Sequence, residues 1–479
     1  MGLNDPLSEF DEPGKSEEAR SEATPAVGKY AWVPDFIGKH LRGTSVRARM
    51  AKGVLWSVIA GVFTRGLFVV LSIVIARLLG EVEFGKWGMV QATVGVLANL
   101  AGMGVGQTLT KHLAELRNGD PVRAGRVFAL AASQAILANF LVAIGCFCLA
   151  DILAWRVLRS PGMASPLALS VLIAVTLGFA MVLECALAGF EAFRKIAHVK
   201  FAEMIATFIV MVALTKLFGL TGAIVGFSLG KIVSIVAYAW MLKGQMRRAR
   251  IPIRLQGAWK EIGVLWHYSL PSLLAALAIS PANWFSLALV GRQPGGFSDM
   301  SGWSASERWR GIVGFIPQHI RLVALPVLSQ LKGAQDVRRY KKAFLANLAV
   351  TVVMSLLIAA PVALLSPWIM RLYGPSYVDK WDILVVLLGV ATVQAALGVF
   401  APLFVSSGKV WMFFWYNVLW AALLLGGSLR LVPLYGLRGF IWALLVAYIA
   451  SLIAHGVGGW VLLNRQRVNP EASRESAQD

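Results

Sequence analysis

Long apolar runs, separated by short polar breaks, dominate the chain after residue 52. Most of these runs are about 20 residues long, the length that a helix needs to cross a hydrocarbon core about 30 Å thick. The alternating ten-residue segments of a membrane β-barrel do not occur. The pattern therefore predicts twelve membrane-spanning helices, at residues 53–78, 86–110, 124–149, 166–189, 201–217, 221–242, 265–290, 306–329, 343–366, 382–406, 411–430 and 437–462.

The eighth predicted helix, 306–329, is much more polar than the others. A segment of this kind cannot face lipid, so it can span the membrane only if its polar side chains face protein or water. These side chains belong to Arg308, Arg310, Gln318, His319 and Arg321.

The composition agrees with a membrane protein. Hydrophobic residues make up 57% of the 479-residue chain and charged residues only 15%, whereas about a quarter of the residues in a soluble domain are charged. The loops between the predicted helices are too short to form a catalytic or nucleotide-binding domain, and no GxxxxGK[ST] motif is present. We therefore expect neither an enzyme nor a cofactor.

The cysteines give no indication of a metal or disulfide site. Cys146, Cys148 and Cys185 all fall in apolar segments and lack the spacing and the histidine partners of a metal site. We expect buried apolar thiols and no metal.

The formal charge of +20 comes mainly from basic residues in the loops on one side of the predicted helices. Cytoplasmic loops of membrane proteins carry such an excess, so this side is predicted to be cytoplasmic, with both termini inside. The charge then reflects topology and not nucleic-acid binding. Tryptophans near the opposite helix ends are predicted to form an interfacial belt: Trp155, Trp303, Trp309, Trp368 and Trp381.

The two ends of the chain are polar. Residues 1–50 open with an acidic stretch that lacks the apolar core of a signal peptide, so this tail is predicted to be cytoplasmic and largely disordered. Residues 31–42 fit either an interfacial helix or an ordered linker. Residues 464–479 are predicted to be a second disordered cytoplasmic tail.

Three short matches indicate an internal repeat. Gly53-Val54-Leu55-Trp56 recurs as Gly263-Val264-Leu265-Trp266, Asn118-Gly119-Asp120 resembles part of 332–336, and Gly219-Leu220-Thr221-Gly222 resembles Gly436-Leu437-Arg438-Gly439. The matches occur in the same order in both copies. We therefore predict an all-α fold with two pseudo-symmetric six-helix bundles, 51–242 and 265–463, joined by a basic linker at 243–264 and surrounding a central cavity.

Charged residues in the middle of the predicted helices indicate what this cavity binds. Each costs about 2.5–3.5 kcal/mol to insert, so it requires a partner or a watery cavity. Cations slightly outnumber acids there, and several lie on polar faces with helical spacing. The lumen is therefore predicted to be cationic and its ligand anionic, with substrate-binding candidates Arg65, Lys231, Arg310, Gln318 and Arg321.

An alternative is that these cations are neutralised in structural ion pairs by Glu184 or Glu203. The same two carboxylates, with His319, are the candidates for ion coupling. Because a guanidinium can bind phosphate through two hydrogen bonds, Arg65 and Arg321 suit a phosphate better than Lys231 does.

Some local sequences also resemble a known family. Lys52-Gly53-Val54-Leu55-Trp56, Ala76-Arg77-Leu78-Leu79-Gly80 with Glu83-Phe84-Gly85, and Gly104-Val105-Gly106-Gln107 resemble the O-antigen-type oligosaccharide flippases of the multidrug/oligosaccharidyl-lipid/polysaccharide (MOP) superfamily. The resemblance covers about residues 50–462.

This resemblance implies a protein of the bacterial inner membrane that moves an undecaprenyl-pyrophosphate-linked oligosaccharide from the cytoplasmic to the outer leaflet by alternating access. Its expected partners are the lipid-linked anionic oligosaccharide and membrane lipids, with polysaccharide polymerase and export components beyond them. Nucleic acid is not expected.

Three other functions remain open. A multidrug/cation antiporter of the same superfamily would need intramembrane carboxylates, for which Glu184 and Glu203 are the candidates. A membrane saccharide polymerase or ligase would need a large outer loop, and the longest predicted here, about 291–305, is short. A scaffold that transports nothing would not need the lumen cations.

Overall fold

The computed structural model describes residues 46–102, 105–253, 255–261, 279–320, 328, 330–331, 337–407 and 409–465. The chain divides into two compact units, Met1–Leu55 and Trp56–Asp479. Several sequence predictions lie outside the described residues. These are most of the disordered tails, the helix at 31–42, Arg321, and the repeat matches at 263–266 and 332–336; residues 46–50 and 464–465 of the predicted tails are helical.

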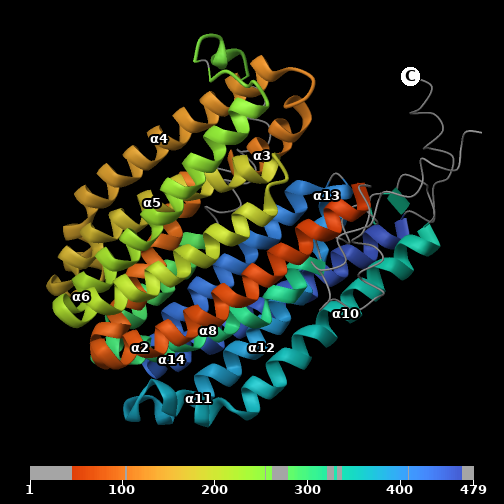
Figure 1. Ribbon diagram of the computed structural model, residues 1–479. Helices are drawn as coiled ribbons and strands as arrows, with labels where there is room; N and C mark the ends of the chain where they lie inside the picture. The colour runs from red at the N-terminus through yellow and green to blue at the C-terminus, as the bar shows by residue number, and fades with distance from the viewer. Residues whose placement is uncertain are drawn as a thin grey trace, which may run out of the picture. The chain divides into compact units, whose positions relative to one another are not determined.

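All regular structure in the described ranges is helical (Figure 1). A further helical segment covers residues 279–291, and the π-helix η2 and the 3-10 helices η3, η4 and η5 occupy Leu153–Val157, Pro161–Met163, Ala258–Glu261 and Pro375–Lys380. The α-helices are α2 (Val46–Gly102), α3 (Val105–Leu116), α4 (Pro121–Ile152), α5 (Ala164–Gly189), α6 (Phe193–Arg248), α8 (Gly296–Val313), α10 (Val337–Leu364), α11 (Ser366–Tyr373), α12 (Trp381–Gly398), α13 (Phe400–Ser406) and α14 (Val410–Arg465).

Three of these helices are pairs of helices joined at one glycine. The backbone leaves the helical conformation at Gly80, Gly219 and Gly436, where φ is 75°, 57° and 56°. Side chains disfavour such positive φ values, so glycine is suited to these turns. Helices α6 and α14 therefore each contain two of the predicted membrane spans, and α2 contains the span 53–78 and most of the span 86–110.

The structure shows the predicted duplication. Helices α6 and α14 each have 56 residues, and the turning glycine stands 26 positions after the first residue in both. The turns have nearly the same geometry, with ψ of −134° at Gly219 and Gly436. When α6 is aligned with α14 at the turning glycines, helix α5, which precedes α6, aligns with α12 and α13, which precede α14.

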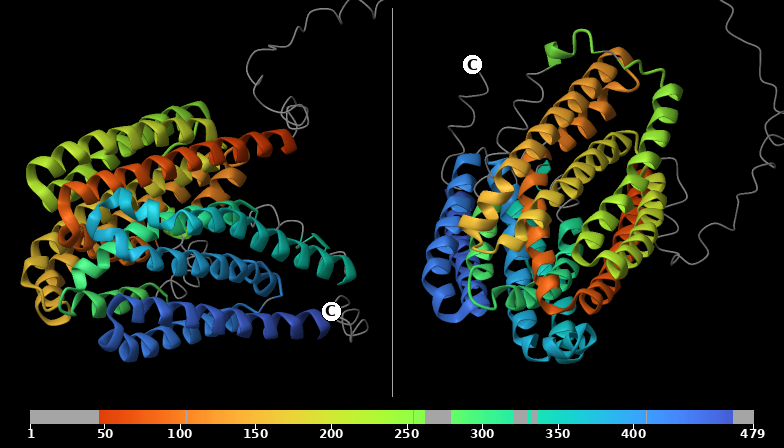
Figure 2. Two further views of the ribbon diagram at one scale, coloured as in Figure 1. Left: turned by 90° about the horizontal axis from the view of Figure 1, so that it is seen from below. Right: turned by 90° about the vertical axis from the view of Figure 1, so that its left-hand side faces the viewer.

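Equivalent helices also occupy equivalent places in the packing. Helix α5 packs against α3, α4 and α6, and α12 packs against α8, α10 and α14. Figure 2 shows α12 running beside α10 and α14. These contacts fall into two sets, and the helices are grouped accordingly. The first half comprises the helices up to α6, with α2 included by its place in the chain, and the second half those from 279 onward.

The described helices have the surface of a membrane protein. Seven helical stretches are long and apolar enough to cross a membrane within the described residues. Large apolar side chains are exposed along them, including Phe147, Leu217, Trp240 and Leu364, each more than 70% exposed. In a bilayer these side chains face lipid, so the protein is a multi-pass membrane protein.

Two predicted boundaries are wrong. The eighth helix begins at Gly296 and not at residue 306, so most of the predicted loop 291–305 is helical. Ser301, Ser304 and Ser306 of this helix are buried. Helix α2 lies close to it, since a Cβ at Gly85 of α2 would lie 1.7 Å from the Phe297 carbonyl oxygen. The linker predicted at 243–264 also begins as helix, since α6 continues to Arg248.

The predicted tryptophan belt is wrong at Trp303 and stays a prediction at Trp155, Trp368 and Trp381. Trp155, Trp368 and Trp381 are 62%, 60% and 46% exposed, as side chains at a membrane interface would be. Trp303 is only 5% exposed and packs edge-on against Phe440, so it belongs to the core. The misplaced start of α8 explains this error.

Candidate functional site: a charged cavity in the first half

The first half contains a cavity of about 620 Å³ between α2, α5 and α6. Apolar and aromatic side chains, among them Phe68 and Phe227, form much of its wall. Four predicted site residues line it, from three separate helices: Arg65 on α2, Glu184 on α5, and Glu203 and Lys231 on α6. The folding of α6 back on itself at Gly219 brings Glu203 opposite Lys231.

Both carboxylates in this cavity are paired with lysines. The Lys231 ammonium donates a hydrogen bond to Glu203, and the Lys200 ammonium lies 2.6 Å from a carboxylate oxygen of Glu184. The structural ion pair considered from the sequence is therefore present for Lys231. Lys200 was not among the predicted site residues because it stands just before the predicted helix 201–217.

Arg65 has a different environment. The central carbon of its guanidinium lies 4.2 Å from the centre of the Phe315 ring, a cation–π contact. No carboxylate of the described residues pairs with it. The cavity wall thus carries three cations and two carboxylates, and the surplus positive charge is assigned to Arg65.

A smaller cavity of about 250 Å³ lies in the second half. Arg310 and Gln318, two predicted site residues, line it together with Glu307 and Gln394. The Arg310 guanidinium donates two hydrogen bonds to Glu307, at 2.6 and 2.7 Å, and a third to the Gln394 side chain at 2.8 Å. Arg310 is therefore already neutralised, which makes it a weaker anion ligand than Arg65.

His319 contacts its own helical segment. Its Nδ1 lies 3.0 Å from the Phe315 carbonyl oxygen, and its ring packs against the Phe315 ring at 4.4 Å. The walls of the two cavities described above do not include it. Its role in ion coupling stays a prediction.

Arg308 is a further cation, half-buried, that the sequence did not single out as a site residue. Its Nη2 donates a hydrogen bond to the Gln91 side chain at 2.5 Å, and its guanidinium lies 4.8 Å from the Phe68 ring centre. Arg308 thereby connects α8 to α2, between the two halves. It was missed because it lies off the regular stripe formed by Glu307, Arg310 and Gln318.

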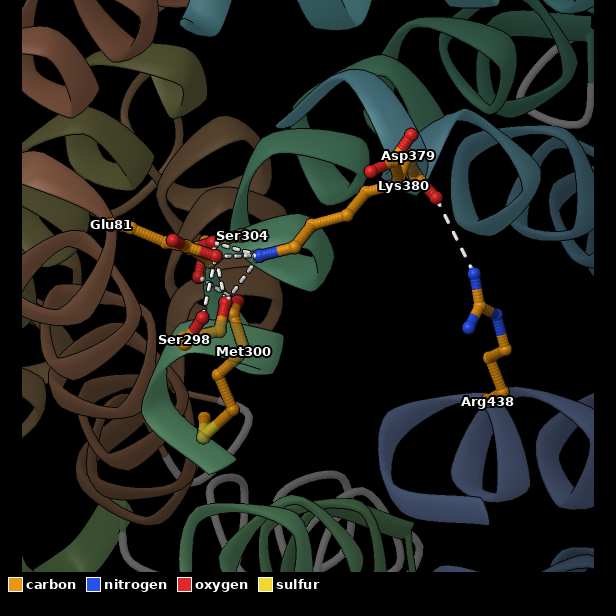
Figure 3. Close-up of polar contacts among 8 residues, drawn as sticks. Glu81, Ser298, Met300, Ser304, Asp379, Lys380 and Arg438 are labelled. Carbon is orange, nitrogen blue, oxygen red and sulfur yellow. Dashed lines mark hydrogen bonds and ion pairs between the residues drawn. The ribbon is translucent and has the colours of Figure 1, made fainter. Parts of the chain in front are cut away.

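Ion pairs and hydrogen bonds join the two halves near Gly80. The Lys380 ammonium of η5 contacts the Glu81 carboxylate and donates to the Ser298 carbonyl oxygen at 2.7 Å and to the Ser301 hydroxyl at 3.1 Å. The Ser298 hydroxyl donates to Glu81 at 2.5 Å. Figure 3 shows Lys380 reaching from its own segment to Glu81 and Ser298.

Other contacts reinforce this junction, called here the Gly80 end. Arg77 Nε donates to the Leu372 carbonyl oxygen at 2.7 Å, and the hydroxyls of Ser72 and Tyr373 lie 2.9 Å apart. Both connect α2 of the first half to α11 of the second.

The charged cavity lies toward the opposite end of the helices. Glu184 stands five residues before the end of α5, and Lys200 seven residues after the start of α6, whereas α6 reaches its turn only at Gly219. At this opposite end Arg117 binds Glu191 at 2.7 Å and the Gly189 carbonyl at 3.1 Å, which are contacts within the first half. Among the described residues, the ion pair and hydrogen bonds of the Gly80 end therefore tie the two halves together away from these contacts.

The described residues contain no group of three or more histidine, cysteine, aspartate or glutamate side chains arranged to hold a metal ion. The three cysteines are free, and Cys146 is buried, whereas Cys148 is exposed.

Comparison with known families identifies the chain. The model of the family described as polysaccharide biosynthesis protein matches residues 50–332, more than half of the sequence. The chain belongs to this family. No curated protein matches it.

Solved structures with a similar fold come from the MOP superfamily. An inward-facing multidrug resistance MATE family transporter has a TM-score of 0.67 at 16% identity, covering 85% of this chain and 96% of its own. A MOP superfamily transporter from Pyrococcus furiosus has a TM-score of 0.65 at 17% identity, covering 87% and 96%. An outward-facing MATE transporter has 0.58 at 17%, covering 90% and 98%. This polysaccharide biosynthesis protein therefore has the MOP fold.

Proposed function

We propose that the protein is a flippase, which carries an undecaprenyl-pyrophosphate-linked oligosaccharide from the cytoplasmic to the outer leaflet by alternating access. The observation that carries this proposal is Arg65, a cation without a carboxylate partner among the described residues, at the wall of a cavity where both acids are already paired. Such a wall favours an anion. A guanidinium suits the oxygens of a pyrophosphate.

The proposed orientation places the Gly80 end at the outer face of the bacterial inner membrane and both termini in the cytoplasm. Basic residues of the opposite end, such as Arg117, Lys195 and Arg247, support this by the positive-inside rule. The cavity would then be loaded from the cytoplasmic side while the Gly80 end is closed. Since the cytoplasm is negative, moving the anionic head outward releases about 2.3 kcal/mol per charge per 100 mV.

The paired carboxylates weigh against an antiporter. An exchanger of drug for cation needs a carboxylate that is available to the cation, but Glu184 and Glu203 each hold a lysine. The structure also weighs against a polymerase or ligase. Such an enzyme would need a large outer loop, and most of the longest predicted outer loop is part of α8. Polymerase and export components are proposed as partners that take up the flipped product.

A binding measurement tests the proposal. Purified protein in nanodiscs is titrated with undecaprenyl-pyrophosphate-linked oligosaccharide and, separately, with the same glycan on neutral undecaprenol. Hydrogen bonds to charged groups are worth about 1.5–3 kcal/mol, so R65Q should weaken binding of the pyrophosphate form roughly tenfold to a hundredfold. R65K should weaken it less.

The control variant is R156Q, which removes an exposed arginine that does not line the cavity. It should bind both lipids as the wild type does. Equal affinity of the wild type for the charged and the neutral lipid, or an R65Q variant with unchanged affinity, would overturn the proposal.

A further inference from the structure

A second pocket with basic side chains lies at the Gly80 end, outside the charged cavity. It has a volume of about 590 Å³. One wall comes from the first half, with Arg77 and Glu81 of α2, and the other from the second half, with Arg371 and Tyr373 of α11 and Tyr377 of η5. The pocket shares no lining residue with the charged cavity.

The charges in this pocket favour an anion. Arg77 and Arg371 are both exposed. The Arg77 Nε is bound to the Leu372 carbonyl oxygen, which holds the guanidinium in place and leaves its two Nη groups for a ligand. Glu81 is the one acidic residue of the pocket lining, and Lys380 and Ser298 already occupy its carboxylate. Two arginines that line one pocket can both bind a phosphate.

The surroundings indicate that this phosphate belongs to a lipid. Trp368, one turn before Arg371 on α11, is 60% exposed, and Trp381 just after η5 is 46% exposed. Exposed tryptophans mark the level of the lipid head groups. Beside the arginines, the apolar side chains of Leu78, Val82 and Leu372 are 41%, 49% and 50% exposed, which provides a surface for acyl chains.

We propose that this pocket binds the phosphate head group of an anionic lipid of the outer leaflet. Because its two walls belong to different halves, a bound lipid connects them and stabilises the conformation in which the Gly80 end is closed. The proposal rests on the orientation given above and does not depend on what the charged cavity transports.

The test is lipid binding to the full chain. The protein is reconstituted in nanodiscs of phosphatidylcholine that contain increasing phosphatidylglycerol, and the retained lipids are counted by native mass spectrometry. The wild type should hold one phosphatidylglycerol more tightly than phosphatidylcholine. The double variant R77Q/R371Q should bind this lipid at least tenfold more weakly. The matched control is R156Q/R292Q, which removes the same charge at two exposed arginines outside the pocket and should bind as the wild type does.

Arg77 also contacts the Leu372 carbonyl, so its loss could disturb the fold. The single variant R371Q covers this case, and it should weaken phosphatidylglycerol binding at least threefold while R371K retains it. Unchanged binding by R77Q/R371Q, or by R371Q if the double variant does not fold, would overturn the proposal. So would displacement of the lipid by millimolar inorganic phosphate, because the pocket would then be a site for a soluble anion. No transport is measured, so this result and that of the flippase test are independent.

Discussion

Lys380 and Glu81 are 299 residues apart in the sequence and form an ion pair that joins the two halves of the protein. Both side chains are largely covered, at 13% and 25% exposed, and Ser298 and Ser301 complete the hydrogen bonding around them. A transporter that alternates between two conformations must break such a contact when this end opens. If the protein alternates as proposed, we expect this pair to stabilise the conformation in which the Gly80 end is closed.

Removing one charge of this pair should favour opening. In E81Q the amide can still accept a hydrogen bond, but Lys380 loses its counter-charge. We expect the closed-to-open equilibrium to shift toward open about tenfold, which corresponds to ~1.4 kcal/mol. Spin labels on α2 and α11 near Gly80, with distances measured by pulsed electron resonance, report the two populations.

The charge-reversed double variant E81K/K380E provides the control. It restores opposite charges across the same junction, so it should return the distance distribution toward that of the wild type. The single variant K380E, which places two carboxylates at the junction, is measured for comparison. A double variant that is as open as K380E would show that the pair does not stabilise the closed state.

The tight turns of α6 and α14 make a stability prediction. A Cβ at Gly222 would lie 1.9 Å from the Leu214 carbonyl oxygen, and one at Gly439 would lie 2.2 Å from the Leu431 carbonyl oxygen. These are backbone atoms, which cannot move aside as a side chain can. G222A and G439A should each lower stability by about 1–3 kcal/mol or more, measured as the melting midpoint in detergent by fluorescence-detected size exclusion.

G244A is the matched control for these variants. Gly244 is exposed in the same helix, α6, and a Cβ there meets open space. Alanine stabilises a helix by up to about 1 kcal/mol relative to glycine, so this variant should be at least as stable as the wild type. Similar destabilisation in all three variants would mean that the close approach of the helices is not the cause.

We expect the Lys231–Glu203 pair to stabilise the fold and not to bind the substrate. K231M leaves the Glu203 carboxylate without its counter-charge in a largely apolar cavity, so it should reduce stability by about 3–5 kcal/mol at most, and by less where water reaches the cavity. The double variant K231M/E203L removes both charges and should recover most of the melting temperature. Its glycan export should stay within about threefold of the wild type.

The same double variant separates the two roles considered for Lys231. Recovered stability without recovered export would show that Lys231 or Glu203 also acts on the substrate or on a coupling ion. The structural role would then be insufficient to explain why the pair is present.

Arg321 lies outside the described residues, so its role in substrate binding stays a prediction from the sequence. R321A should abolish glycan export while the protein is still inserted and expressed, and R321K should rescue export in part if charge alone is required. Export of surface polysaccharide, normalised to the amount of protein in the membrane, is the measurement. Normal export by R321A would remove this residue from the mechanism.

Much of the fold could be predicted because the bilayer dictates the length and the apolar character of a spanning helix. The duplication was also visible, since the turn at Gly219 and its copy at Gly436 impose the same backbone geometry and therefore similar sequences. The start of α8 could not be found in this way. Its first turns are polar because Ser301 and Ser304 face protein, and a buried polar helix resembles a loop in a hydropathy pattern.

The site was harder to predict than the fold. Arg65 and Lys231 could be recognised because a charge in the middle of an apolar helix is costly. Whether each is paired depends on contacts across a turn or between helices, as with Glu203 and Lys231, which are 28 residues apart and meet only because α6 folds back. The junction of Glu81 with Lys380 connects α2 and η5, which belong to different halves, and leaves no local pattern in the sequence.

The leaflet distribution of the lipid-linked saccharide tests the central claim most directly. It would be measured in cells that lack this protein, with the wild type, R65Q or R156Q added back at equal membrane levels. We expect completed units to accumulate on the cytoplasmic side without the protein and with R65Q, and to reach the outer leaflet with the wild type and R156Q. Units that reach the outer leaflet in cells lacking the protein, but stay unpolymerised or unattached there, would contradict the flippase and favour a membrane enzyme.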